Sequence, residues 1–241
     1  MSQSRKLQSG EDKMAGSKWQ LMVRQLVHRL KNGFSPACPW IALLGLDGSG
    51  KSSVVQQLEG TVGAAGYAGL FVLHRRPRLV YRAAAASRAG QIEHYTKPPH
   101  SPARSAVKLA AMWLDWVVGY GLQIHGRRMR GILVVADRHS LLDLQADPLR
   151  YRYGGSPRWV RLAARLSPMP DAILLLDAPT AVLQTRKQEL TVEQAAELRR
   201  NYLHVVNQWD RDRSYIINAS QPLDQVVVNV QQVLTEIRNS R

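Results

Sequence analysis

The stretch GLDGSGKSS, which begins at Gly45 directly after the apolar run WIALL, constrains the fold of this chain more than any other feature. It fits the pattern G-x-x-x-x-G-K-[ST] from Gly45 to Ser52, with a predicted buried strand before it and a predicted helix after it. Glycines let successive N–H groups point inward without a Cβ clash, and the helix N-terminus adds partial positive charge. The stretch therefore predicts a phosphate-binding loop between a strand and a helix.

A loop of this type has separate places for a nucleotide and a metal ion. Its lysine, Lys51, is expected to reach the β and γ phosphates, and the hydroxyl of Ser52 is expected to bind Mg²⁺. We therefore expect ATP and Mg²⁺ as cofactors, surrounded by the residues Asp47, Gly48, Ser49, Gly50, Lys51, Ser52 and Ser53.

Asp47 is the unusual member of the loop, because a carboxylate beside a triphosphate costs Coulomb energy unless it faces away. We expect it to accept hydrogen bonds from a second substrate, such as a sugar hydroxyl. The alternative is a solvated acid at the rim of the loop.

Five apolar runs alternate with helical patterns along the rest of the chain. The predicted strands are residues 40–44, 70–74, 132–136, 172–176 and 214–218. The predicted helices are residues 52–66, 105–128, 156–166, 180–190, 191–209 and 222–238, and a long polar loop precedes the second of them. Continuous apolar strands that alternate with helices are typical of a parallel sheet covered on both faces. We predict an α/β fold, with a doubly wound five-stranded parallel sheet in three α/β/α layers, for residues 37–241.

The first 36 residues differ from this pattern. Residues 1–17 are polar and are predicted to be disordered. The segment KWQLMVRQLVHRLKNGF places apolar residues at three- and four-residue spacing, which predicts an amphipathic helix. This helix could lie on an anionic membrane surface, but packing on the domain that follows is the favoured expectation.

The composition excludes several classes of protein. The single cysteine, Cys38, rules out an internal disulfide framework, and the first residues lack the apolar run of a signal peptide, so we expect a cytoplasmic location. The longest apolar stretch, from Ala106 to Leu122, carries Lys108 and Asp115, which favours a buried amphipathic helix over a membrane span.

The formal net charge of +15 attracts anionic partners, but the arginines are scattered, which favours a pocket for a phosphorylated small molecule over specific nucleic-acid binding. Whether the chain forms a homodimer is left open.

A second candidate cluster, ADRH, ends the third predicted strand, where ligands bind in open α/β sheets. Asp137 is suited to the water shell of Mg²⁺ or to orienting the attacking group, and Arg138 to gripping a phosphate. The alternative is an acid–arginine pair that caps the strand end, and His139 is expected only to pack.

A third cluster follows the fourth predicted strand. It contains Arg186, Lys187 and Glu189 near the end of one helix, and Arg199 and Arg200 on the next. Cations of this kind close over a transferring phosphoryl group, although a solvated helical hairpin is an equal alternative for each residue. Asp177 is expected to be structural.

These stretches, together with PDAILLLDAPTAVLQTRK and INASQPLDQVVVNV, resemble the thymidylate kinase family of P-loop nucleoside-monophosphate kinases, in order and spacing over residues 40–237. The resemblance implies transfer of the γ-phosphoryl group of ATP to a nucleoside monophosphate. It also implies roles for individual residues: acceptor sugar contact for Asp47, metal or acceptor contact for Asp137, acceptor phosphate binding for Arg138, lid closure for Arg186 and adenine contact for Asn218 and Ala219.

The acceptor half departs from the family. LHRRPRLVYR stands where the family has an R-E-P-G-G-T segment, so Arg75 and Arg76 become the candidates for acceptor phosphate. SLLDLQADPLRYRYGG replaces the run that reads the thymine ring. HRRP, KPPHSP and DPLRYRYGG are similar to kinase-like relatives that accompany bacterial surface-polysaccharide genes, which implies a sugar or glycolipid acceptor as an alternative. A second alternative is a non-catalytic ATP-binding module with a basic surface for a membrane or nucleic acid.

Overall fold

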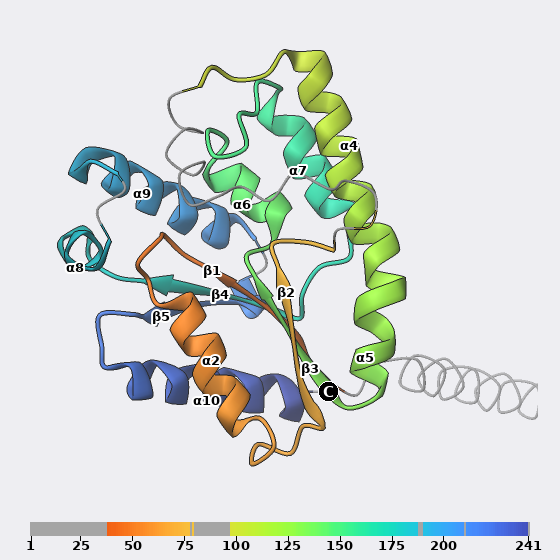
Figure 1. Ribbon diagram of the computed structural model, residues 1–241, viewed down its shortest axis with the longest axis vertical. Helices are drawn as coiled ribbons and strands as arrows, with labels where there is room; N and C mark the ends of the chain where they lie inside the picture. Colours follow the sequence, from red (N-terminus) through yellow and green to blue (C-terminus); the bar gives the residue numbers. More distant parts are fainter. Residues whose placement is uncertain (1–37, 78, 80–96, 188–189, 210, 241) are drawn as a thin grey trace, which may run out of the picture. The chain divides into compact units, whose positions relative to one another are not determined.

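Five parallel strands form one sheet in the order β2-β3-β1-β4-β5 (Figure 1). The strands are β1 Trp40–Leu44, β2 Gly69–His74, β3 Ile132–Asp137, β4 Ala172–Asp177 and β5 Ser214–Asn218. The computed structural model describes residues 38–77, 79, 97–187, 190–209 and 211–240. The tail and amphipathic helix predicted for residues 1–36 lie outside the described residues, as does most of the predicted long loop. The α/β fold and the five-stranded parallel sheet are confirmed, and each strand lies within one residue of its predicted ends.

Helices cover both faces of this sheet (Figure 1). One face carries α2 Lys51–Thr61 and α10 Leu223–Asn239. The other face carries α4 Pro102–Gly119, α6 Ser140–Ala146, α7 Pro157–Arg165 and α9 Val192–Gln208. The remaining helices are the π-helix η1 Tyr120–His125, α5 Gly126–Met129, α8 Thr180–Arg186 and the 3₁₀ helix η2 Arg211–Arg213.

Three helices differ from their predictions. The predicted helix 105–128 runs as α4, η1 and α5 in succession, and α2 ends at Thr61 because glycines follow, with Gly66 at a positive φ of 80°. Helix α8 ends at Arg186 rather than at residue 190. Helix α6 was not predicted, because almost all of its side chains are buried and it shows no amphipathic period.

The core lies on both sides of β1, whose five residues are all fully buried. Ile41 and Leu43 pack in a cluster that contains side chains of α2 and α10. Trp40 packs on the opposite face against Trp116 of α4, with their ring centroids 5.6 Å apart. Because side chains alternate along a strand, this continuous apolar run supplies both core layers, and each buried large side chain contributes roughly 2 kcal/mol.

The connections of β1 position the site. After β1 the chain passes to α2 on one face, whereas after the neighbouring strands β3 and β4 it passes to helices on the other face (Figure 1). The loops that leave the carboxyl ends of these strands therefore diverge, and such a point is where open α/β sheets bind ligands.

Candidate functional site

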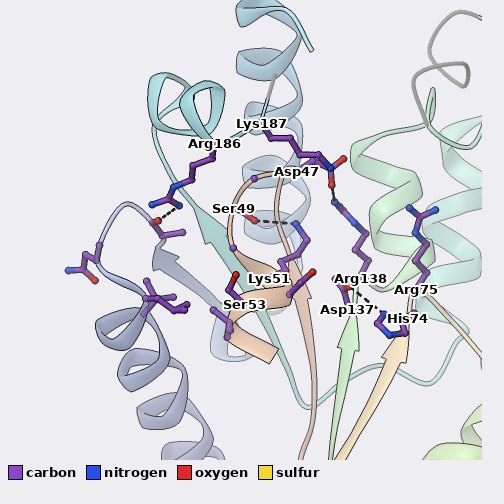
Figure 2. Close-up of a pocket in the computed structure, with 18 residues that line it drawn as sticks. Asp47, Ser49, Lys51, Ser53, His74, Arg75, Asp137, Arg138, Arg186 and Lys187 are labelled. Atoms are coloured by element: carbon purple, nitrogen blue, oxygen red, sulfur yellow. Dashed lines mark hydrogen bonds and ion pairs between the residues drawn. The ribbon is translucent and has the colours of Figure 1, made fainter. Parts of the chain in front are cut away.

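The glycine-rich loop from Gly45 to Gly50 connects β1 to α2 and lines a pocket of about 620 Å³ (Figure 2). Gly45, Gly48 and Gly50 have φ values of 140°, 87° and 87°, which L side chains rarely adopt. A Cβ at Gly45 would lie 2.6 Å from the carbonyl oxygen of Leu176. The glycines are thus required by the local backbone, as the sequence pattern predicted.

The pocket collects residues from four strand ends and from the helices α2, α8 and α10. Of the predicted site residues it is lined by Asp47, Gly48, Ser49, Gly50, Lys51, Ser52, Ser53, Arg75, Asp137, Arg138, Arg186 and Ala219. It also contains Lys187 of the third predicted cluster, together with His74 and Gln221, which were not among the predicted ligand-binding residues. Two predicted residues, Arg76 and Asn218, do not line it.

Lys51 is buried at the base of the loop (Figure 2). Its Nζ donates hydrogen bonds to the carbonyl oxygens of Gly45 at 2.9 Å and Leu46 at 2.7 Å, and to Oγ of Ser49 at 3.1 Å. Burial, reinforced by the nearby positive charge of Arg138, lowers the pKa of Lys51 to about 7. Its hydrogen-bond acceptors are all neutral oxygens, while the carboxylates of Asp47 and Asp137 act on it from a longer range and partly oppose the lowering of its pKa.

Asp47 lies between two arginines. Its Oδ1 accepts a hydrogen bond from Nη2 of Arg138, and its Oδ2 accepts one from Nη2 of Arg150, both at 2.5 Å. Burial opposes ionisation of Asp47, but Arg138, Arg150 and Lys51 together hold its pKa well below the ordinary value. Asp47 is therefore an ion-paired acid that stays charged at neutral pH, and not the solvated acid of the alternative prediction.

Arg138 continues this network into the core. Its Nη1 donates to Oδ1 of Asp143 at 3.0 Å, to the hydroxyl of Tyr202 at 2.9 Å and to the carbonyl oxygen of Gly45 at 2.9 Å. The fully buried Asp143 also accepts hydrogen bonds from the hydroxyls of Tyr151, at 2.8 Å, and Tyr202. Burial would raise the pKa of Asp143, but the arginines and tyrosines lower it to about 2.

Four members of this network were not predicted from the sequence: Asp143, Arg150, Tyr151 and Tyr202. Arg150 is 103 residues from Asp47, and nothing in their spacing indicates the contact. One local signal was present, because Asp147 and Arg150 are three residues apart and form an ion pair at 3.1 Å. Asp143 lies within the run SLLDLQA, where a lone acid among apolar residues indicates a buried charge with a partner.

Asp137 ends β3 at the edge of the pocket (Figure 2). Its Oδ2 lies 3.6 Å from Nδ1 of His74 at the end of β2. Its Oδ1 is buried and has no hydrogen-bond partner among the described residues. Since a buried carboxylate oxygen is normally paired, this atom is suited to a cation or its bound water.

Arg75 and Arg138 follow the ends of adjacent strands with left-handed backbones, at φ values of 66° and 71°. The N–H of Arg75 donates to the carbonyl oxygen of Asp137 at 2.8 Å, and the N–H of Arg138 donates to that of Leu43 at 3.0 Å. These hydrogen bonds fix the backbone from which both guanidinium groups reach the pocket.

The third predicted cluster is divided between two roles. Nη1 of Arg186 donates to the carbonyl oxygen of Ala219 at 2.9 Å on the rim of the pocket (Figure 2). Arg199 instead forms a bidentate pair with Asp177, with both N···O distances 2.7 Å. Asp177 is thus ion-paired at the end of β4, in keeping with the structural role expected for it.

The structure places Arg76 and Asn218 away from the predicted contacts. Arg76 is buried, and its Nε donates to Oδ2 of the fully buried Asp115 in α4 at 2.9 Å. This ion pair with a core carboxylate supports the packing of α4. Of the two adjacent arginines, Arg75 lines the pocket and Arg76 does not. The side chain of Asn218 accepts hydrogen bonds from the backbone and hydroxyl of Ser220, which leaves Ala219 as the lining residue.

His139 packs, as expected. Its ring is fully buried and stacks on Trp116 with centroids 3.9 Å apart. Burial lowers its pKa to about 3, so the ring is neutral at physiological pH.

The pocket as a whole suits a polyanion. Backbone amides at the start of α2 and the cations Lys51, Arg75, Arg138, Arg186 and Lys187 surround one space. Among the described residues, no group of three or more His, Cys, Asp or Glu is placed to hold a metal ion. Comparison with models of protein families finds none that matches the chain, and comparison with curated proteins finds no match.

Proposed function

We propose that this chain is an ATP- and Mg²⁺-dependent phosphotransferase with a P-loop, similar to thymidylate kinases, that transfers the γ-phosphoryl group to an anionic acceptor. The observation that carries the proposal is the glycine-rich loop, with its three positive-φ glycines, leading into α2 above a buried lysine. Loops of this geometry at the carboxyl end of a parallel strand direct their amides at phosphate oxygens.

The donor side of the site is the loop itself. Its amides and Lys51 would hold the β and γ phosphates, and Arg186 and Ala219 lie where the rest of the nucleotide would extend. Lys51 now donates to neutral oxygens, so a triphosphate would add negative charge within hydrogen-bond distance of its ammonium group and raise its pKa.

The residues present fit a bound Mg²⁺. The ion usually binds through one or two protein oxygens together with phosphates and water. Ser52 and Asp137 both line the pocket, and Oδ1 of Asp137 has no hydrogen-bond partner among the described residues. When bound, the ion would neutralise charge on the transferred group.

The acceptor side is formed by Arg75, Arg138 and Asp47. The two arginines would bind an acceptor phosphate, and Asp47 would orient a hydroxyl or accept a hydrogen bond from it. A phosphate acceptor attacks with an oxygen that is already ionised, so the transfer needs positioning and charge neutralisation and no strong base. A hydroxyl acceptor must lose a proton, and Asp47 is a weak base because its pKa is held low.

A nucleoside monophosphate is the acceptor that the family resemblance implies. One observation favours a phosphorylated sugar or glycolipid instead: no Phe, Tyr or Trp is among the described residues that line the pocket. Tyr151 and Tyr153, in the segment that replaces the thymine-reading run, donate their hydroxyls to Asp143 and to the carbonyl oxygen of Ser156. They are thus used inside the fold and not for stacking on a base.

The test is a survey of ADP release with ATP, Mg²⁺ and a panel of nucleoside monophosphates and phosphorylated sugars. We expect one acceptor class to stimulate ADP release, and Lys51→Ala to abolish it. Arg76→Lys is the matched control, because Arg76 lies outside the pocket, and it should retain turnover in the folded fraction. If every acceptor fails while calorimetry shows ATP binding, the chain is a non-catalytic ATP-binding module and the proposal is wrong.

A further inference from the structure

Helix α7 carries three separate stripes of side chains. Val160 and Ala164 are buried against the rest of the fold. At about 100° per residue, Trp159, Leu162 and Leu166 fall on a second stripe, and Arg158, Arg161 and Arg165 on a third. Trp159 and Leu166 are each 62% exposed, and Leu162 is 44% exposed. A helix of this kind, with an apolar stripe bordered by arginines, is typical of segments that lie in a membrane interface.

Helix α4 lies beside α7 and extends this apolar surface (Figure 1). Its apolar stretch predicts a buried amphipathic helix, but one side of the helix is open to solvent. Ala106 and Ala110 are exposed, Val107 is 72% exposed and Leu114 is 38% exposed. None of the described helices is long and apolar enough to cross a membrane. The exposed side of α4 is thus an apolar surface without a covering element among the described residues.

A groove of about 560 Å³ runs between the two helices. It is lined by Pro102, Ala106, Leu109, Ala110, Trp113, Tyr153, Gly155, Trp159, Leu162, Ala163 and Leu166. Nε1 of Trp113 donates to the carbonyl oxygen of Leu166, and the hydroxyl of Tyr153 donates to that of Ser156. These polar atoms are used within the fold, so the groove offers apolar volume with little to orient a specific peptide.

The border of the groove is strongly basic. Helix α7 carries three arginines, Arg158, Arg161 and Arg165, and no acidic residue. Arg158, Arg161 and Arg165 are exposed and form no ion pair with any described residue. Long basic side chains beside an apolar stripe can bury their stems while their charged ends reach phosphates.

We propose that the α4–α7 face, defined by the groove residues with Val107, Leu114 and the three arginines of α7, binds the surface of an anionic phospholipid bilayer. Trp159, Leu162 and Leu166 enter the boundary between headgroups and acyl chains, and the arginines contact lipid phosphates. This contact is independent of the proposed phosphoryl transfer, because none of these residues lines the nucleotide pocket.

Two other occupants fit the surface less well. A second copy of the chain would place the same patch against itself about a two-fold axis, and the arginine stripes would then repel each other. Nucleic acid would satisfy the arginines, but its interfaces are polar and would leave the apolar stripe without a partner. A bilayer with anionic headgroups matches both the apolar and the basic stripe.

The experiment is co-sedimentation of the full chain with vesicles of phosphatidylcholine alone or mixed with phosphatidylglycerol. We expect binding to the anionic vesicles and at least tenfold weaker binding to the neutral ones. Leu162→Glu should weaken binding at least tenfold, and Arg161→Gln combined with Arg165→Gln about thirtyfold. The controls are Val228→Glu on α10, which is similarly exposed, and Arg200→Gln combined with Arg238→Gln. Neither control should change binding, and neither should Lys51→Ala.

A second measurement places the contact on the molecule. The chain has a single cysteine, Cys38, which is buried, so Leu166→Cys and Val228→Cys can each carry an environment-sensitive fluorophore. We expect a blue shift with anionic vesicles at position 166 and none at position 228.

Three outcomes would overturn the proposal. One is the absence of vesicle binding by the unaltered chain. Another is binding that survives Leu162→Glu but is lost with Leu26→Glu, which would assign the contact to the amphipathic segment before residue 37. The third is a dimer in sedimentation velocity that Leu162→Glu dissociates while vesicles remain unbound.

Discussion

Replacement of Asp143 by asparagine removes the buried negative charge that accepts hydrogen bonds from Arg138, Tyr151 and Tyr202. The new amide group would present N–H donors where two hydroxyls and a guanidinium already donate. Arg138 would keep Asp47 as a charged partner but would lose the one inside the core. We therefore expect Asp143→Asn to lower the free energy of unfolding by about 3 kcal/mol, at the low end of the range for removing one member of a buried pair.

The pKa of Asp143 gives a second route to this magnitude. It is about 2 in the folded chain against an ordinary value of 3.8. At about 1.4 kcal/mol for each pH unit, the ionised carboxylate contributes about 2 kcal/mol. Because the folded-state pKa is the lower one, this contribution is present in full above pH 3.8 and is lost as the pH falls towards 2. About 1 kcal/mol of it should disappear between pH 5 and pH 3.

The assay is urea unfolding followed by tryptophan fluorescence for both proteins at several pH values. The difference in stability between the unaltered chain and Asp143→Asn should shrink by about 1 kcal/mol from pH 5 to pH 3. Asp177→Asn is the matched control, since it breaks a partly exposed pair with Arg199 and should cost about 1 kcal/mol or less. The reasoning is refuted if Asp143→Asn costs no more than this control, or if the difference does not depend on pH.

Three further predictions concern the glycine-rich loop. The pKa of Lys51 is about 7, so the side chain is largely neutral at pH 8 and ATP binding should be accompanied by the uptake of a proton. Calorimetry would detect this uptake as a binding enthalpy that changes with the ionisation enthalpy of the buffer. Lys51→Ala should keep the fold and lose the proton uptake. Asp47→Asn should raise the acceptor KM or lower kcat more than it changes ATP affinity, and the reverse pattern in steady-state kinetics would move Asp47 to the donor side. Gly45→Ala should lower the free energy of unfolding in urea by about 2 kcal/mol or more, because its Cβ would lie 2.6 Å from the carbonyl oxygen of Leu176. In Gly60→Ala of α2 the new Cβ meets nothing within 4 Å, so this variant should raise the free energy of unfolding by about 0.5 kcal/mol. Equal effects of the two substitutions would contradict this reasoning.

The central strands could be predicted because burial on both faces demands continuous apolar runs. WIALL coincides with the fully buried β1, whose pattern depends only on the core around it, and SYIIN coincides with the edge strand β5, of which Ile217 is the buried residue. The glycine-rich loop could be predicted as well, because positive φ values and close backbone contacts restrict its positions to glycine. In both cases the constraint, burial or a positive φ, acts on residues that are consecutive in the chain, so it produces a pattern that can be recognised in the sequence.

The arginines could not be assigned from the sequence in the same way. Arg75 and Arg76 are adjacent, but one faces the pocket and the other binds Asp115, a partner 39 residues away. The contact between Arg150 and Asp47 spans 103 residues. A long charged side chain pairs with whichever group the tertiary fold brings near it, and the residues next to it in the sequence do not indicate which group that is. The same holds for the open side of α4, whose apolar residues would look identical if they were buried.

The left-handed backbones of Arg75 and Arg138 determine how this rim can respond to a ligand. Both residues are tied into the sheet by their own N–H groups, and the carbonyl oxygen of Arg75 also accepts a hydrogen bond from the N–H of Ser140 at 3.0 Å. The guanidinium group of Arg75 therefore extends from a fixed backbone, and capture of an anion restricts rotation about its side-chain bonds without ordering any main chain, whereas the guanidinium group of Arg138 is already held by Asp47, Asp143 and Tyr202. The restriction is at most about 2 kcal/mol for Arg75, whereas ordering a loop costs about 1–2 kcal/mol for every residue in it. A β-branched residue at position 75 or 138 would strain the left-handed backbone, and this strain would disturb the rim of the pocket in addition to the loss of the positive charge.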